Sequence, residues 1–173
     1  MDLYERTVSV EKIYEGKVLK LNIETVELPD GNYSEKEILK HPGGVAILAY
    51  TSEDTILLVE QFRKPIERVL FEIPAGKIEA NEALEVCAMR ELEEETGFKA
   101  KKMKYLGKIV TAPGYCDEYI HFYKAEELYK GTIGGDEDEF IQVHQLKIDR
   151  IKELIKSGEI IDGKTIAALM LLE

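Results

Sequence analysis

The sequence predicts an α/β (α+β) domain in which helices cover a mixed sheet. Short apolar runs rich in branched residues, such as residues 45–50 and 55–60, are bounded by turn signals and indicate strands. Residues 84–96 and 148–156 instead carry apolar side chains at helical spacing. Strands and helices do not alternate regularly, which favours a mixed sheet over a wholly parallel one. A chain of 173 residues is long enough to bury one substantial core.

The composition limits the partners and the compartment. The net charge is −11, from 23 basic and 34 acidic residues, which argues against a nucleic-acid binder. No apolar run approaches the roughly 20 residues that span a bilayer, so no membrane association is expected. The first residues lack a basic segment followed by an apolar one, so they do not resemble a signal peptide. Two cysteines make no disulfide framework, and a reduced, cytoplasmic setting is expected.

Residues 1–40 are predicted to form an N-terminal β segment. Residues 11–28 alternate in part between apolar and polar, Pro-Asp-Gly-Asn at 29–32 is a turn signal, and residues 33–39 form the returning strand. An isolated hairpin is marginally stable, so this segment must pack on the rest of the chain or on another subunit.

Residues 41–173 are predicted to form the main domain. Strands at 45–50 and 55–60 form a core hairpin around a turn at 52–54, and 69–73 is another short strand. A helix begins near 81–83 and ends at Gly97, a residue typical of helix C-termini. Strands at 105–110 and 118–123 flank a loop at 111–117, and an acidic loop at 131–139 precedes a strand at 140–146. Helices at 148–156 and 165–172 end the chain.

Three glutamates of the central helix, Glu91, Glu94 and Glu95, point to a metal site. At 100° per residue they share an arc of about 100° with Leu84 and Cys87. Like charges in a partly apolar stripe need a compensating cation, and hard oxygen ligands suit Mg²⁺ or Mn²⁺. The glutamates alone would favour the alternative, a solvated acidic face, but their surroundings have a fixed spacing. That spacing is Gly76, five residues, Glu82, seven residues, Arg90-Glu91-Leu92, one residue, Glu94-Glu95, one residue, Gly97-Phe98.

This spacing resembles the signature box of the Nudix hydrolases. The resemblance implies a Nudix fold, an α/β/α sandwich with a mixed sheet, to which this chain adds an N-terminal antiparallel β segment. It also implies Mg²⁺-dependent attack of water on the pyrophosphate of a nucleoside diphosphate derivative, with Mn²⁺ as an alternative and two or more ions at each site. Metal-ligand positions of the family fall on the carbonyl of Ala75 and on Glu91, Glu94 and Glu95, the last also catalytic. Structural positions of the box fall on Gly76, Glu82, Arg90 and Gly97.

Three further segments resemble the ADP-ribose pyrophosphatases of this family. They are Val59-Glu60-Gln61-Phe62-Arg63, Glu72-Ile73-Pro74-Ala75-Gly76 and the loop that contains Pro113-Gly114. The resemblance implies that Arg63, Glu72, Pro113 and Gly114 bind substrate. The alternative interpretation of Arg63 is that it is an exposed arginine in a turn, with no role in binding. Thr111-Ala112 and Tyr115-Cys116 depart from the usual residues around Pro-Gly, and these departures are expected to alter the fit around the terminal ribose.

The acidic loop supplies the expected general base. The resemblance places a catalytic glutamate there, and Glu137 and Glu139 both match.

The implied reaction is hydrolysis of ADP-ribose to AMP and ribose 5-phosphate. Alternative substrates are GDP-mannose, NADH and FAD, and a non-catalytic ligand-sensing Nudix module ranks lower because the box is complete. The resemblance also implies a homodimer in which the N-terminal strands are exchanged.

Overall fold

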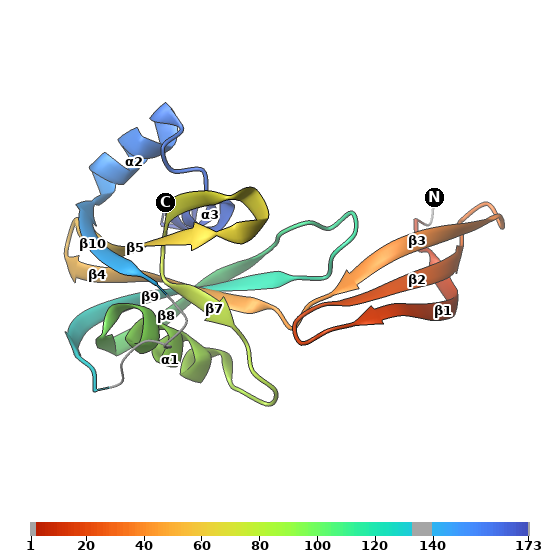
Figure 1. Cartoon of the computed structure of the whole chain (residues 1–173), viewed down its shortest axis with the longest axis horizontal. Coiled ribbons are helices and arrows are strands. Elements are labelled where there is room, and N and C mark those ends of the chain that lie inside the picture. Colours follow the sequence, from red (N-terminus) through yellow and green to blue (C-terminus); the bar gives the residue numbers. More distant parts are fainter. Residues whose placement is uncertain (1–2, 133–139, 173) are drawn as a thin grey trace. The chain divides into compact units, whose positions relative to one another are not determined.

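The computed structural model describes residues 3–132 and 140–172. Contacts within the chain divide it into two compact units. The first comprises residues 1–43 and 110–119, and the second comprises residues 44–109 and 120–173. Figure 1 shows the elements of both units. No helix in the described ranges is long and apolar enough to cross a membrane.

The first unit is built on a three-stranded antiparallel sheet. Its strands are β1 (Arg6–Glu15), β2 (Lys20–Glu27) and β3 (Tyr33–Lys40), in that order. The expectation of one strand over 11–28 was wrong, because the chain turns at Gly16, whose N–H donates to the carbonyl of Leu19 at 2.9 Å. The turn lies where Gly16 stands between Glu15 and Lys17, a break in the apolar pattern. The predicted turn at 29–32 is confirmed, with Gly31 at a φ of +85°.

The second unit is built on a seven-stranded mixed sheet. The strands β10 (Gln142–Lys147), β5 (Thr55–Arg63), β4 (Gly44–Ser52), β9 (Tyr119–Lys130) and β8 (Phe98–Val110) follow one another in this order. Two short strands lie off this path: β6 (Arg68–Glu72) pairs with β5, and β7 (Ala75–Lys77) pairs with β4. Strand β4 runs parallel to β9 and antiparallel to β5 and β7, which confirms the mixed sheet.

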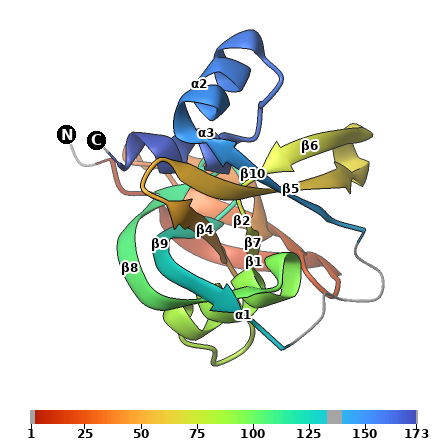
Figure 2. The same ribbon diagram turned by 90° about the vertical axis from the view of Figure 1, so that its left-hand side faces the viewer.

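Helices cover both faces of this sheet. Alternate residues of β4 enter two core clusters: Ala46 and Leu48 join one, and Val45 and Ile47 join the other. The first cluster includes side chains of α2 (Ile148–Ser157) and α3 (Gly163–Met170), and the second includes side chains of α1 (Leu84–Thr96). Figure 2 shows α1 on one side of the sheet and the two C-terminal helices on the other. This is the predicted α/β/α sandwich.

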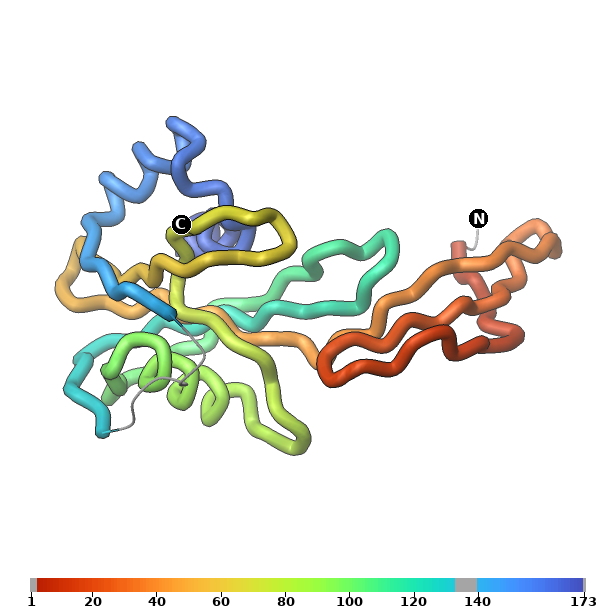
Figure 3. Tube along the Cα trace, in the orientation of Figure 1, coloured from red at the N-terminus to blue at the C-terminus, as the bar shows by residue number. Residues whose placement is uncertain are grey.

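The central helix has the predicted boundaries. Gly97 adopts the left-handed conformation with a φ of +73°, and its N–H donates to the carbonyl of Glu93 at 2.7 Å. The following strand, β8, starts at Phe98 rather than at the expected residue 105. Its first half is lysine-rich, with Lys101, Lys102 and Lys104 exposed, so it lacks an apolar strand signal. Figure 3 shows β8 and β9 running side by side.

Candidate active site

The entry to the box packs directly on the central helix. The N–H of Ala75 in β7 donates to the carboxylate of Glu95 at 2.8 Å. The carboxylate of Glu91 lies so close to Gly76 that a Cβ added there would sit 1.8 Å from its Cδ. Gly76 has no side chain, so it leaves room for the Glu91 carboxylate against the entry to the box.

Arg90 binds three carboxylates. Its Nε and Nη2 donate to the two oxygens of Glu82, both at 2.9 Å, in a bidentate pair. Its Nη1 donates to Glu91 and to Glu94, both at 2.8 Å, and its Nη2 also donates to the carbonyl of Lys77 at 3.2 Å. The hydrogen bonds from Arg90 lower the pKa of Glu82 to about 2, and Glu82 in turn raises the pKa of Arg90. Arg90 therefore links the start of the box to two of its predicted metal ligands.

The donor chemistry of this cluster fits a hard divalent cation. Glu91, Glu94 and Glu95 offer carboxylate oxygens beside the backbone of Ala75, and oxygen ligands of this kind suit Mg²⁺ and Mn²⁺. In the described part of the chain, however, no three Asp, Glu, His or Cys side chains converge as a ready-made metal centre. Arg90 engages Glu91 and Glu94, and the Ala75 N–H engages Glu95. An ion would therefore bind as these carboxylates exchange partners.

A second charged network surrounds Glu72, a predicted substrate residue. Its side chain is 1% exposed and accepts hydrogen bonds from Nε and Nη2 of Arg63, both at 2.7 Å. Lys164 also donates to Glu72, and it donates to Asp162 at 3.0 Å. Burial alone would raise the pKa of Glu72, but the hydrogen bonds and positive charges of Arg63 and Lys164 outweigh it and lower the pKa. Sequence reasoning missed Lys164, whose only local signal is the helix-capping Asp162.

Glu93 is a further buried carboxylate that sequence reasoning missed. The box pattern leaves its position unspecified, yet its side chain is 1% exposed. It pairs with Lys99 at 2.8 Å and accepts from the N–H of Thr132 at 2.8 Å. A Cβ at Gly131 would lie 2.5 Å from Glu93, so the backbone can approach only at a glycine. Glu93 thus connects the box helix to Thr132, which follows β9 and lies 39 residues further along the chain.

Two further predicted substrate residues belong to a turn after β8. Pro113 and Gly114 belong to a turn of the first unit, where the N–H of Tyr115 donates to the carbonyl of Ala112 at 3.1 Å. The backbone of Leu39 holds this turn at the end of β3, since its N–H donates to the carbonyl of Tyr115 at 2.7 Å. The substrate roles of Pro113 and Gly114 stay predictions. Glu137 and Glu139 lie outside the described residues.

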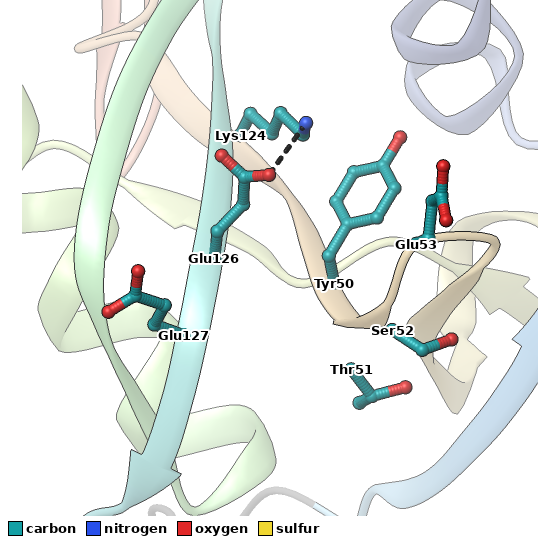
Figure 4. A pocket seen from close by; sticks show the side chains of 7 residues that line it. All are labelled: Tyr50, Thr51, Ser52, Glu53, Lys124, Glu126 and Glu127. Atoms are coloured by element: carbon teal, nitrogen blue, oxygen red, sulfur yellow. Dashed lines mark ion pairs between the residues drawn. The ribbon is translucent and has the colours of Figure 1, made fainter.

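A hollow on the surface of the second unit lies away from the box. Figure 4 shows its lining at the β4–β5 turn and on β9, where Lys124 pairs with Glu126 at 2.8 Å and lies 4.6 Å from the ring centre of Tyr50. The box entry instead pairs with the first residues of β4, at 44–46. The hollow contains no residue of the box. It is lined by Tyr50, Thr51, Ser52, Glu53, Lys124, Glu126 and Glu127.

Comparison with known proteins agrees with this geometry. A family model described as the NUDIX domain matches residues 40–169. The chain belongs to the NUDIX family. It is 47% identical over 173 residues to an ADP-ribose pyrophosphatase of Bacillus subtilis (strain 168), covering 99% of this chain and 94% of that protein. It is 46% identical over 171 residues to a methanol dehydrogenase activator of Bacillus methanolicus, covering 98% of this chain and 92% of that protein.

A solved structure extends the agreement to the whole fold. The crystal structure of an ADP compounds hydrolase superposes with a TM-score of 0.87, covering 99% of this chain and 94% of that one, at 22% sequence identity. At this identity the likeness concerns the fold. It confirms the Nudix fold that the box implied.

Proposed function

We propose that this Nudix hydrolase cleaves the pyrophosphate bond of ADP-ribose to give AMP and ribose 5-phosphate. The observation that carries the proposal is the full-length similarity to an ADP-ribose pyrophosphatase. In the reaction, a water oxygen forms a bond to one phosphorus atom, the bridging P–O bond breaks, and the protons of water are shared between solvent and the two phosphate monoesters. The products are chemically distinct from the substrate, because each ends in a monoester.

The box residues supply a platform for divalent cations. Ala75, through its carbonyl, and Glu91, Glu94 and Glu95 would hold Mg²⁺ or Mn²⁺, two or more ions at a site. When bound, such ions neutralise phosphate charge and acidify water. This local positive charge would also offset the net charge of −11, which would otherwise repel an anionic substrate.

Other residues bind and orient the substrate. Arg63 presents a half-exposed guanidinium suited to bidentate contact with a phosphate, and Glu72 fixes the orientation of that guanidinium. Pro113 and Gly114 contact the substrate from the loop after β8. A glutamate takes the proton of the attacking water, and Glu95, Glu137 and Glu139 are the three candidates.

A substrate panel tests the proposal. The chain is incubated with Mg²⁺ and ADP-ribose, GDP-mannose, NADH or FAD, and the release of phosphate monoesters is measured with a phosphatase that cannot attack the substrates. We expect the highest kcat/KM with ADP-ribose. A higher value with another substrate would reassign the specificity, and no release from any of them would favour a non-catalytic module.

A second candidate function is activation of an alcohol dehydrogenase. It is favoured by the full-length similarity to a methanol dehydrogenase activator. The test adds the chain to a purified methanol dehydrogenase and follows alcohol oxidation, with the Glu94→Gln variant as the control for any role of hydrolysis. An unchanged oxidation rate would exclude this function.

We propose further that residues 1–40 form a dimerisation segment, that residues 41–173 form the Nudix domain, and that the chain is a homodimer. Strand β1 is exposed along its whole length and carries exposed apolar side chains that include Val8, Val10 and Ile13. An exposed strand edge with apolar side chains is a site where another chain pairs. A second copy of this chain is the proposed partner, and exchange of these strands is the proposed mode.

A further inference from the structure

Two cations share one buried carboxylate at the end of β6. Arg63 holds both oxygens of Glu72, and Lys164 donates to one of the same oxygens. The two cations differ in exposure, since the side chain of Arg63 is 41% exposed and that of Lys164 is 15% exposed. One cation thus faces solvent in part, while the other is held inside.

We propose that Lys164 is a positioning residue that keeps Glu72 neutralised while Arg63 engages the phosphates of the substrate. This inference rests on the proposed function, because it concerns the residue proposed to bind the substrate. Lys164 itself touches no reacting atom. It acts through Glu72 and Arg63.

The cost of an unpaired buried carboxylate is the reason for a second cation. Removing one partner of a buried ion pair leaves an uncompensated charge, which is strongly unfavourable. If Arg63 were the only partner of Glu72, movement of its guanidinium toward a phosphate would leave the buried carboxylate without a cation. Lys164 removes the conflict because Glu72 keeps one cation throughout.

Arg63 has donors to spare for a ligand. Its guanidinium carries five N–H groups, and its contacts with the described residues use Nε and Nη2 only, both toward Glu72. Glu72 therefore orients the fork, and the Nη1 group can reach an anion.

The first turn of α3 fixes Lys164 in place. Asp162 caps this helix by accepting from the N–H of Thr165 at 2.9 Å and from its hydroxyl at 2.6 Å. The same hydroxyl accepts from the N–H of Ile73 at 2.9 Å, next to Glu72. The helix start is therefore tied to the strand end that carries Glu72, which holds the backbone of Lys164 near that carboxylate.

A kinetic cycle on the full-length chain tests the proposal, using Lys164→Met, Glu72→Gln and the double variant. We expect Lys164→Met to raise KM for ADP-ribose about tenfold with kcat nearly unchanged, and Lys164→Arg to restore KM. In the Glu72→Gln background there is no charge to neutralise, so Lys164→Met should leave KM unchanged. A Lys164→Met effect on kcat alone, or one that persists in the Glu72→Gln background, would overturn the proposal.

An unfolding cycle tests the shared carboxylate without any turnover. Urea midpoints are compared for Arg63→Met, Lys164→Met and the double variant. Because either cation alone can neutralise Glu72, the double variant should lose more than the sum of the two single losses. An additive result would overturn the inference. An unmodified chain that cleaves no substrate would refute the proposed function, and the unfolding cycle would still decide the role of Lys164.

Thr165→Val is the matched control. It removes the hydroxyl that accepts from Ile73 but leaves all the charges around Glu72 in place. We expect a lower urea midpoint with KM unchanged. A rise in KM equal to that of Lys164→Met would show that loosening α3 is sufficient, which would overturn a charge role for Lys164.

Discussion

The carboxylate of Glu91 fills the space that a side chain at residue 76 would need. A Cβ at Gly76 would lie within 2.1 Å of three atoms of that carboxylate. Gly76 and Glu91 are therefore complementary, and the glycine of the box has a steric role in placing a predicted metal ligand. Nη1 of Arg90 donates to the same carboxylate at 2.8 Å.

Gly76→Ala should impair activity more than stability. The atoms that clash belong to the end of a flexible side chain, so the carboxylate can move aside, at about 1–3 kcal/mol for overpacking. A displaced ligand is expected to lower kcat by about 100-fold, as a misplacement of roughly 1 Å can. Urea unfolding and steady-state kinetics measure the two effects. Gly163→Ala, where a Cβ meets nothing within 4 Å, is the control and should keep full activity.

Glu94→Gln should lower turnover by orders of magnitude while the fold is retained. The substitution removes one charge from the proposed metal platform and weakens one of the contacts of Arg90. Glu85→Gln is the matched control, because Glu85 lies exposed in the first turn of the same helix. Steady-state kinetics at saturating Mg²⁺ and circular dichroism compare the two. Turnover within a few-fold of the unmodified chain would show that Glu94 is no metal ligand.

Removal of divalent cations should abolish hydrolysis and lower the melting temperature. A ligand that binds only the folded state stabilises it by about 2.7 kcal/mol at a hundred times its Kd. Mg²⁺ added back after EDTA should raise Tm in the unmodified chain and much less in Glu94→Gln. Ca²⁺ and Mn²⁺ in parallel show whether the shift is selective. Equal shifts in both proteins would place the stabilising ion away from the box.

The box and its helix could be predicted from sequence because their signals are local. Gly97 ends the helix through its own backbone conformation, and the spacing from Gly76 to Gly97 fixes which residues share the helix face. The continuous apolar run of β4 likewise indicates that both faces of this strand are buried. These features depend on neighbours within a few turns or strands.

The partners of buried charges could not be predicted in the same way. Glu72 meets Lys164 across 92 residues, and Glu93 meets Thr132 across 39. A buried glutamate and an exposed one have the same sequence signal, since burial depends on which distant segment packs above them. The turn at Gly16 was missed for a different reason. Its signal is local, a glycine between Glu15 and Lys17, but the partial alternation of residues 11–28 was interpreted as a single strand.

The stability contributed by Glu82 should disappear in acid. Its pKa falls from 4.5 to about 2 in the folded chain because Arg90 donates to both of its oxygens. A lowered folded pKa favours the charged form, so the contribution is complete above about pH 5 and is lost as pH falls toward 2. Urea midpoints of the unmodified chain and of Glu82→Gln should therefore differ at pH 7 and converge near pH 2.

The same experiment has an internal control in Glu85→Gln. Glu85 lies exposed in the first turn of α1, so its variant should follow the unmodified chain at every pH. A gap between Glu82→Gln and the unmodified chain that stays constant down to pH 2 would show that the Arg90 pair does not depend on the charge of Glu82.

Ile13→Lys should dissociate the proposed homodimer. Ile13 is an exposed apolar residue of β1, and a buried lysine at a subunit contact would lack a partner. Light scattering at micromolar concentration should give about 39 kDa for the unmodified chain, twice the 19.7 kDa of one copy, and about 20 kDa for the variant. Val86→Lys, on an exposed position of α1, is the control and should stay dimeric. A monomer mass for the unmodified chain would exclude the proposed homodimer, and with it the proposed exchange of the N-terminal strands.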